Sequence, residues 1–151
     1  MDSAIPVLAI RPATEHDVPE LARLFTALGH PATAAAIAER WREWAAAGNT
    51  ALVAPRRDGA LAGAATLHRM VVLHRPRPVG RITALVVDTP LRGQGVGRAL
   101  VATAEETLAR AGCGLLEITS HARLGDAHVF YERLGYKQTS MRFAKVLAPA
   151  G

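Results

Sequence analysis

Cysteine is almost absent from this chain, whose 151 residues include a single one, Cys113. One thiol cannot close an intramolecular disulfide, which is typical of a protein from a reducing compartment. Cys113 lies between Gly112 and Gly114, where we expect a small packed residue rather than a nucleophile. The N-terminus has no basic region followed by a long apolar stretch, so it does not resemble a signal peptide. The sequence therefore predicts a cytoplasmic protein.

Long apolar runs and blocks of one charge are also lacking. No apolar run reaches the roughly 18 residues that a transmembrane helix needs, so no membrane partner is expected. Lys and Arg exceed Asp and Glu by 18 to 13, but the basic residues are scattered and only 5% of residues are aromatic. This pattern indicates a solvated, mildly basic surface before it indicates a nucleic-acid interface. We therefore expect no nucleic-acid partner.

Several familiar site patterns are missing. The histidines and acidic residues show no spacing of metal ligands, and no serine lies in a nucleophile elbow, so no metal is expected. Gly97 is followed by Arg98 and Ala99, whereas a Walker loop needs Lys and then Ser or Thr. Glu105 and Glu106 follow the glycines too closely for the acidic residue of a dinucleotide-binding unit.

The chain is half apolar, which is enough to build one sizeable core, so we expect a single domain over residues 1–151. Apolar periodicity and turn residues predict the order βααβββαβαβ, with an optional last strand. Strands are expected at 8–11, 50–54, 60–73, 81–88, 115–120 and 136–147. Helices are expected at 14–28, 33–47 and 126–134, with another from the glycine-rich turn to Gly112.

The most informative segment joins an expected strand, Ile82–Asp88, to the following helix. It contains Arg92-Gly93-Gln94-Gly95-Val96-Gly97-Arg98, in which three glycines alternate and leave the backbone bare. Their N–H groups can point into one small volume at a helix N-terminus, where the helix dipole also favours an anion such as phosphate. Arg92 and Arg98 flank the turn and can pair with phosphate oxygens. The alternative is a plain tight connection between strand and helix.

The segment Arg92–Gly97 resembles the Arg/Gln-x-x-Gly-x-Gly/Ala motif of the Gcn5-related N-acetyltransferase (GNAT) family. A second segment, Asp126–Tyr136, is similar to the motif helix of that family. The resemblance implies an α/β protein with the single-domain acyl-CoA N-acyltransferase fold, a mixed, mostly antiparallel twisted sheet with flanking helices. It also implies transfer of the acetyl group from acetyl-CoA to a primary amine by direct attack. The basic balance of the chain suits a coenzyme that carries several phosphate charges.

The resemblance also assigns the residues that would hold the coenzyme. In the family the glycine-rich loop grips the pyrophosphate, and pantetheine lies where the strands equivalent to 81–88 and 113–120 splay apart. Carried over by position, Leu85 and Val87 would supply backbone groups to pantetheine, and the Val87 N–H would face the thioester oxygen. The expected coenzyme-binding residues are Leu85, Val86, Val87, Arg92, Gly93, Gln94, Gly95, Val96, Gly97, Arg98 and Phe130.

Two residues are candidates for proton transfer. Tyr131 matches the family's tyrosine that protonates the coenzyme A thiolate, and a phenol with a pKa of about 10 can donate at neutral pH. The alternative is that Tyr131 only packs beside Phe130. Glu117 alternates within an apolar strand and is either a general base or a surface residue. His121 and Asp88 are weaker candidates for the base, and a water molecule is a further one.

The acceptor is less well defined by the sequence. The resemblance predicts a site bounded by the two N-terminal helices, including Gly29-His30-Pro31, and by the C-terminal strands. An open site and a net positive charge favour a small-molecule amine over a polycationic acceptor. The alternatives are acetylation of a protein N-terminus, a lysine or aminoacyl-tRNA, and a non-catalytic acyl-CoA sensor. The family also suggests a homodimer through the strand around residues 141–147.

Overall fold

The computed structural model of this chain describes residues 9–119 and 125–149. They fall into two compact units, Met1–Thr119 and Ser120–Gly151. Most of the regular structure belongs to the first unit, whose elements run from the first strand to the fifth. No described helix is long and apolar enough to cross a bilayer.

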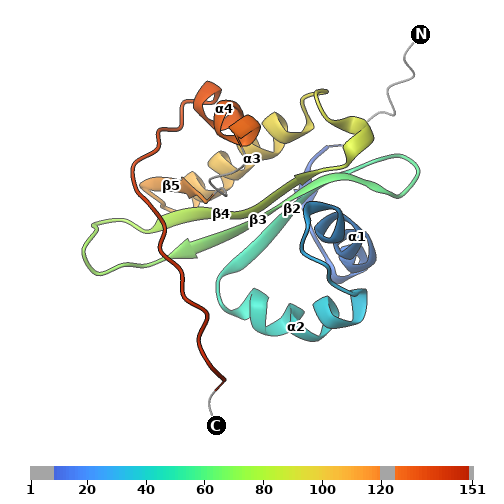
Figure 1. The fold of residues 1–151 in the computed structure, drawn as a ribbon, viewed down its shortest axis with the longest axis horizontal. Coiled ribbons are helices and arrows are strands. Elements are labelled where there is room, and N and C mark those ends of the chain that lie inside the picture. Colours follow the sequence, from blue (N-terminus) through green and yellow to red (C-terminus); the bar gives the residue numbers. More distant parts are fainter. Residues whose placement is uncertain (1–8, 120–124, 150–151) are drawn as a thin grey trace. The chain divides into compact units, whose positions relative to one another are not determined.

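The first unit is built on a five-stranded sheet in the order β1-β2-β3-β4-β5. Neighbouring strands are antiparallel except for β4 and β5, which are parallel. Helices α1 and α2 cover one face of the sheet and α3 covers the other (Figure 1). The expected mixed, mostly antiparallel sheet with flanking helices is confirmed. The strands are β1 Arg11–Pro12, β2 Asn49–Pro55, β3 Leu61–Met70, β4 Val79–Val87 and β5 Leu115–Ile118.

The helix boundaries follow the capping residues of the sequence. Helix α1 (Val18–Leu28) follows a 3₁₀ turn in which the Asp17 carboxylate accepts from the Thr14 N–H at 2.8 Å. It ends at Gly29, whose φ of 100° is the left-handed conformation that glycine adopts most easily. Helix α2 (Ala34–Ala46) begins after Thr33, whose hydroxyl accepts from the Ala36 N–H at 3.1 Å. Helix α3 spans Val96–Arg110.

Apolar side chains fill both faces of the sheet. On the α3 face the fully buried residues include Leu100, Val101 and Ala104. Gly63 and Gly80 let α3 approach the strands closely. A Cβ on Gly80 would lie 2.7 Å from Leu108 Cδ1 of α3. One on Gly63 would lie 3.1 Å from Leu100 Cδ1 of α3 and 2.7 Å from the Val86 carbonyl oxygen of β4. The core against α1 contains Leu21, Leu24, Val53, Leu61, Ala64 and Val86.

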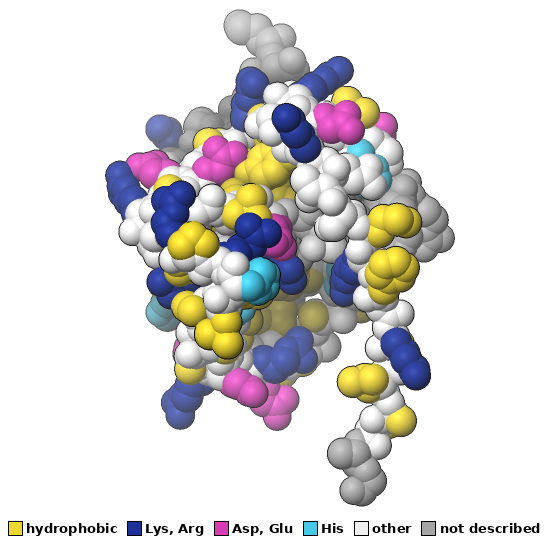
Figure 2. All heavy atoms as spheres, turned by 90° about the vertical axis from the view of Figure 1, so that its left-hand side faces the viewer, with side chains coloured by type: hydrophobic (Ala, Val, Ile, Leu, Met, Phe, Trp, Pro, Cys, Tyr) yellow, Lys and Arg dark blue, Asp and Glu magenta, His cyan; other side chains and the backbone are white. Residues whose placement is uncertain are grey.

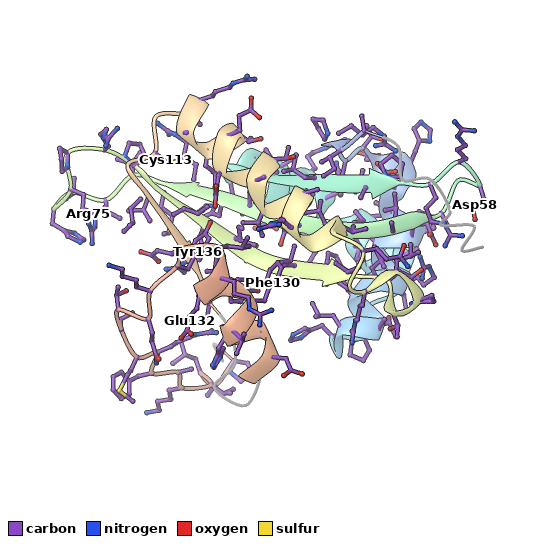
Figure 3. The ribbon with its side chains drawn as sticks, turned by 90° about the horizontal axis from the view of Figure 1, so that it is seen from above. Asp58, Arg75, Cys113, Phe130, Glu132 and Tyr136 are labelled. Carbon is purple, nitrogen blue, oxygen red and sulfur yellow. The ribbon has the colours of Figure 1, made fainter. Side chains whose placement is uncertain are left out.

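Two loops close the long strands at opposite ends of the sheet. Figure 3 shows Asp58 in the turn between β2 and β3 and Arg75 in the loop between β3 and β4. The first turn makes β2 and β3 a hairpin, in which the Arg56 N–H donates to the Ala60 carbonyl at 2.8 Å. The expected strand at 60–73 ends early, at Met70, and β4 begins two residues before the expected 81.

The second unit contains helix α4 (Gly125–Arg133) and an irregular C-terminal segment. Gly135, with φ of 91°, ends the helix, and the Tyr136 N–H donates to the Tyr131 carbonyl at 3.0 Å. The strand predicted at 136–147 is wrong, because residues 136–149 have no regular structure and no described strand pairs with them. The homodimer stays a prediction, without the strand on which it depended. The exposed apolar side chains here include Met141, Phe143, Val146 and Leu147.

Candidate functional site

The outer edge of β4 is only half paired. Its parallel partner β5 is in register from Val79↔Leu115 to Ile82↔Ile118 and then ends. Beyond Ile82, β4 continues to Val87 with no described strand on that side. Backbone groups along this stretch are therefore open to a ligand. The described pairing with β5 thus stops at Ile82, within the segment where the family resemblance predicts that the two strands splay apart.

The direction of these open backbone groups follows from one hydrogen bond. The Asp88 N–H donates to the Ala62 carbonyl at 2.8 Å, so Asp88 faces β3. Hydrogen bonding alternates along an antiparallel pair. Val86 therefore also directs its N–H and C=O at β3, and its side chain is buried in the core. Leu85 and Val87, the residues on either side, direct their backbone groups at the open edge.

A β-bulge lies where β4 leaves β5. The register of β3 with β4 passes from Thr66↔Ala84 to Leu67↔Ile82, which leaves Thr83 as an extra residue. The Thr83 hydroxyl lies 2.7 Å from the hydroxyl of Thr66. Gly80 faces Leu108 of α3, so Ile82, two positions on, faces the same side, whereas Val86 belongs to the core against α1. The extra residue thus puts Ile82 and Val86 on opposite faces of the sheet. Sequence reasoning missed the bulge, because only the register across two strands reveals it.

The glycine-rich turn joins the open edge to the N-terminus of α3. Gly93 and Gly95 have φ of 78° and 87°, and both lie where an added Cβ would meet nothing within 4 Å. The first bonded amide of the helix is that of Ala99, which donates to the Gly95 carbonyl at 3.0 Å. Within the described residues, the backbone N–H groups from Gly93 to Arg98 have no protein acceptor. This is the geometry of an anion-binding helix N-terminus.

Two arginines are available around this turn. Arg92 and Arg98 are exposed, and neither forms an ion pair with any residue that the structure describes. Gln94 makes a long contact, 3.5 Å, from its amide nitrogen to the Pro90 carbonyl. The side chain of Val96 is buried and Gly97 lies in the first turn of α3, so these two members of the motif offer only their backbone N–H groups.

Lysine and arginine side chains are dispersed over the surface, as expected. Figure 2 shows them spread among apolar and neutral groups on one face rather than gathered in a block. Such a surface carries a general positive field, which is suited to a small anionic ligand. On the face shown, the described residues form no broad basic stripe of the kind that tracks a nucleic-acid backbone.

Asp88 is held in an ion-pair cluster. Its carboxylate accepts from Arg23 at 3.1 Å and lies 3.9 Å from Arg56, and its side chain is largely buried. Arg23 also binds Glu20 at 2.8 Å, and these carboxylates raise the pKa of its guanidinium. Asp88 thus anchors the end of β4 to α1 and to the hairpin. Asp88 therefore has a structural role, and its candidacy as a base stays a prediction.

Glu117 lies at the point where the two strands separate. Its carboxylate accepts from the Arg81 guanidinium at 2.8 Å across the parallel pair, and both side chains are about 40% exposed. Arg81 is in register with His68 on β3. His68 Nδ1 and Arg81 Nε are buried and have no partner among the described atoms. These three residues form a polar row at the closed end of the gap between β4 and β5.

Tyr131 and Phe130 belong to the second unit, on α4, and Figure 3 labels Phe130 there. The two rings meet edge to face with centroids 5.4 Å apart, and Tyr131 makes a similar contact with Tyr136 at 6.3 Å. Burial raises the pKa of the Tyr131 hydroxyl above its ordinary value. The hydroxyl is therefore protonated over a wide pH range. His121 lies outside the described residues.

A cavity of about 370 Å³ opens between α1, α2 and the sheet. Gly29 turns the chain at the end of α1, where the His30 N–H donates to the Phe25 carbonyl at 2.9 Å. This turn brings His30 and Pro31 to the cavity wall, where the sequence placed part of the acceptor site. The cavity is lined by Leu21, Phe25, His30, Pro31, Ala32, Ile37, Arg40, Trp41, Trp44, Ala51 and Thr66.

Metal-ligating side chains do not cluster within the described ranges, 9–119 and 125–149. These ranges hold no group of three or more His, Cys, Asp or Glu side chains that could bind a metal ion.

Comparison with known proteins places this geometry in context. The acetyltransferase (GNAT) family matches residues 17–136. A curated relative, aminoalkylphosphonate N-acetyltransferase of Salmonella typhimurium, is 44% identical over 91 residues, which span 60% of this chain and 59% of the relative. The match thus covers less than two thirds of that relative's length.

Solved structures share the fold over nearly the whole chain. A Trypanosoma brucei acetyltransferase is 26% identical with a TM-score of 0.82, over 92% of this chain and 99% of its own. A protein of Agrobacterium tumefaciens is 28% identical with a TM-score of 0.83, over 93% and 100%. The glycine-rich turn, the half-open β4 edge and the family match over residues 17–136 agree, and the chain belongs to the GNAT acetyltransferase family.

Proposed function

We propose that the whole chain, residues 1–151, acts as one N-acetyltransferase domain that moves the acetyl group of acetyl-CoA to a primary amine of a small molecule. One observation carries this proposal: the unbonded N–H groups from Gly93 to Arg98 at the start of α3, continuous with the open edge of β4. Amides without protein acceptors at a helix N-terminus suit a pyrophosphate. An open strand edge suits an extended chain with amide groups, such as pantetheine.

The residues present fit the coenzyme. Arg92 and Arg98 are free to pair with phosphate oxygens beside the loop. Leu85 and Val87 direct their backbone groups outward, so they can bind pantetheine amides, and the Val87 N–H is our candidate donor to the thioester oxygen. Val86 helps differently, since its buried side chain fixes the strand between them. Phe130 is proposed as an apolar contact of the coenzyme.

Direct attack divides the chemistry among few groups. Bound acetyl-CoA supplies an activated acyl carbon, to which the amine nitrogen bonds as the C–S bond breaks and the sulfur leaves as a thiolate. Tyr131 is the proposed donor of a proton to that sulfur, because burial keeps its phenol protonated. Glu117, held by Arg81 at the closed end of the strand gap, is the proposed base for the ammonium, directly or through water. His121 is the remaining candidate.

A small-molecule acceptor fits the cavity beside α1 and α2. Its volume of about 370 Å³ is at the low end of the roughly 300–1,000 Å³ range of ligand sites. The relative that is 44% identical is named for acetylating aminoalkylphosphonates, which are small primary amines. We extend the proposal to a cytoplasmic location, because the single cysteine favours a reducing compartment.

The proposal is tested by incubating the purified chain with acetyl-CoA and a panel of small amines, while release of free thiol is followed. Thiol release that depends on one class of small amine, with the acetylated product identified by mass, is the expected result. Coenzyme A binding without thiol release from any amine would instead indicate an acyl-CoA sensor. Acetylation confined to aminoacyl-tRNA, with salt-dependent tRNA binding, or to protein amines would refute a small-molecule acceptor.

A further inference from the structure

The cavity beneath α1 and α2 is linked to the start of the open edge of β4 by a hydrogen bond between two threonine hydroxyls. Thr66 lines the cavity from β3. Its hydroxyl lies 2.7 Å from that of Thr83, the extra residue at the bulge of β4. The bulge marks the start of the open strand edge. The cavity therefore adjoins the strand edge along which we propose that the coenzyme binds.

The walls of the cavity are apolar on most sides. Phe25 and Pro31 come from the end of α1 and the following loop, and Trp41 and Trp44 come from α2. The two indole rings are neighbours, with centroids 5.0 Å apart and planes tilted by 45°. Such walls bind the apolar body of a ligand through burial and dispersion.

The charge of the cavity has one sign. None of the described residues that line it is acidic, whereas Arg40 and His30 both belong to it. Arg40 is exposed and forms no ion pair with a described residue, so its guanidinium is available to a ligand. A polycationic acceptor would meet no counter-charge here and would be repelled by Arg40. An acceptor with an anionic group would find a partner able to bind it through two parallel hydrogen bonds.

We propose that this cavity selects the acceptor, and that the acceptor is a primary amine carrying an anionic group, phosphonate or carboxylate, on an apolar body. Arg40 pairs with the anion, the aromatic walls cover the apolar body, and the amine lies toward Thr66 and the bulge. This inference rests on the proposed function and specifies its substrate class. Arg40 is a specificity-determining residue in this scheme and takes no part in the proton transfers.

The sequence offers a direct probe of the cavity. The chain has two tryptophans, and both of them, Trp41 and Trp44, line it. Intrinsic fluorescence therefore reports occupancy of this cavity independently of turnover. We would titrate four probes, with and without coenzyme A: phenethylamine, phenylalanine, the α-aminophosphonate analogue of phenylalanine, and aminomethylphosphonate. The first lacks the anion, the last lacks the apolar body, and the other two distinguish carboxylate from phosphonate.

The matched variants are Arg40→Gln and Arg42→Gln, which lie two positions apart on α2. Arg42 is exposed and does not line the cavity. In Arg40→Gln we expect the apparent affinity for the anionic acceptors to fall, and their KM to rise, by about 10- to 150-fold, as for a lost charge-assisted hydrogen bond. Phenethylamine, the KM for acetyl-CoA and the Arg42→Gln variant should be unaffected. Arg40→Lys should recover part of the loss.

Two results would overturn the inference. One is an equal apparent affinity of the natural chain for phenethylamine and for its anionic analogues, measured by tryptophan fluorescence. The other is thiol release with an acceptor that does not change tryptophan fluorescence and whose turnover does not depend on Arg40. That result would leave the proposed function intact. Conversely, an anionic amine that binds through Arg40 without any thiol release would support the cavity assignment and contradict the proposed function.

Discussion

Replacing Gly95 by valine tests the proposed coenzyme loop, and the chain supplies its own control. Gly95 has φ of 87° at the N-terminus of α3, and Gly112 has φ of 88° just beyond its C-terminus. An added Cβ meets nothing within 4 Å at either position. The two substitutions therefore impose the same backbone strain at opposite ends of one helix, without steric clash in the folded protein.

The expected magnitudes separate stability from binding. A side chain in the left-handed region costs roughly 1–2 kcal/mol, and a β-branched one tends to the upper end. At about 2–4 °C per kcal/mol, each variant should melt a few degrees lower and remain folded. In Gly95→Val, relief of the strain rotates the adjoining peptide units, which turns the Gly95 and Val96 N–H groups away from a ligand. Each lost hydrogen bond to a charged group is worth roughly 1.5–3 kcal/mol, about 10- to 150-fold in affinity.

Calorimetric titration of coenzyme A into the natural chain and both variants measures the effect, with thermal unfolding as the check of folding. Gly95→Val should lose at least about tenfold in affinity. Gly112→Val should bind like the natural chain. The reasoning is refuted if a folded Gly95→Val variant binds coenzyme A as tightly as Gly112→Val does, or if both lose affinity equally.

Three further outcomes are expected. Tyr131→Phe should keep coenzyme A affinity but lower turnover by roughly 10²–10⁴-fold. The alkaline limb of the pH–rate profile should also disappear, a limb that burial places above the ordinary tyrosine pKa. Near-natural turnover of this variant, measured where chemistry is rate-limiting, would leave Tyr131 a structural residue. Hydrogen bonds from Arg11 lower the pKa of the Asp17 carboxyl in the folded protein. The stability that they contribute is therefore present above the unfolded-state pKa near 3.8, and it is lost as the pH falls through the lower folded-state pKa. Asp17→Asn should therefore lower the free energy of unfolding by about 1–3 kcal/mol at neutral pH. Urea unfolding of the variant and the natural chain should give the same free energy in strong acid. Gly80→Ala should lower stability by about 1–3 kcal/mol, because the new methyl would lie 2.7 Å from Leu108 Cδ1, and unchanged urea unfolding would contradict this packing argument.

The elements that the sequence predicted well are those that begin or end at a capping or turn residue. Gly29 and Thr33 end α1 and begin α2 because a left-handed residue and a hydroxyl cap act on their own neighbours. The glycine-rich turn was recognisable for the same reason, since its function depends on consecutive backbone groups. In each case the cause of the structure lies within a few residues of its effect.

The features that sequence reasoning missed depend on partners far along the chain. The pairing of Glu117 with Arg81 follows from a parallel register between segments 36 positions apart. The extra residue at Thr83 appears only when β4 is aligned with β3. Apolar alternation at 136–147 predicted a strand, but alternation does not supply a neighbouring edge with which to pair.

The bulge at Thr83 also determines how β4 can change its length. Because the extra residue reverses the side-chain alternation, Ile82 is buried against one helix layer and Val86 against the other. Deletion of Thr83 would leave a strand of ordinary alternation, in which Ile82 and Ala84 pair with the consecutive residues Leu67 and Thr66, so both core side chains would keep their faces. Deletion of a regularly paired residue such as Ala65 of β3 would instead turn one end of its strand to the other face. A library of single-residue deletions should thus show that loss of Thr83 is tolerated better than loss of Ala65.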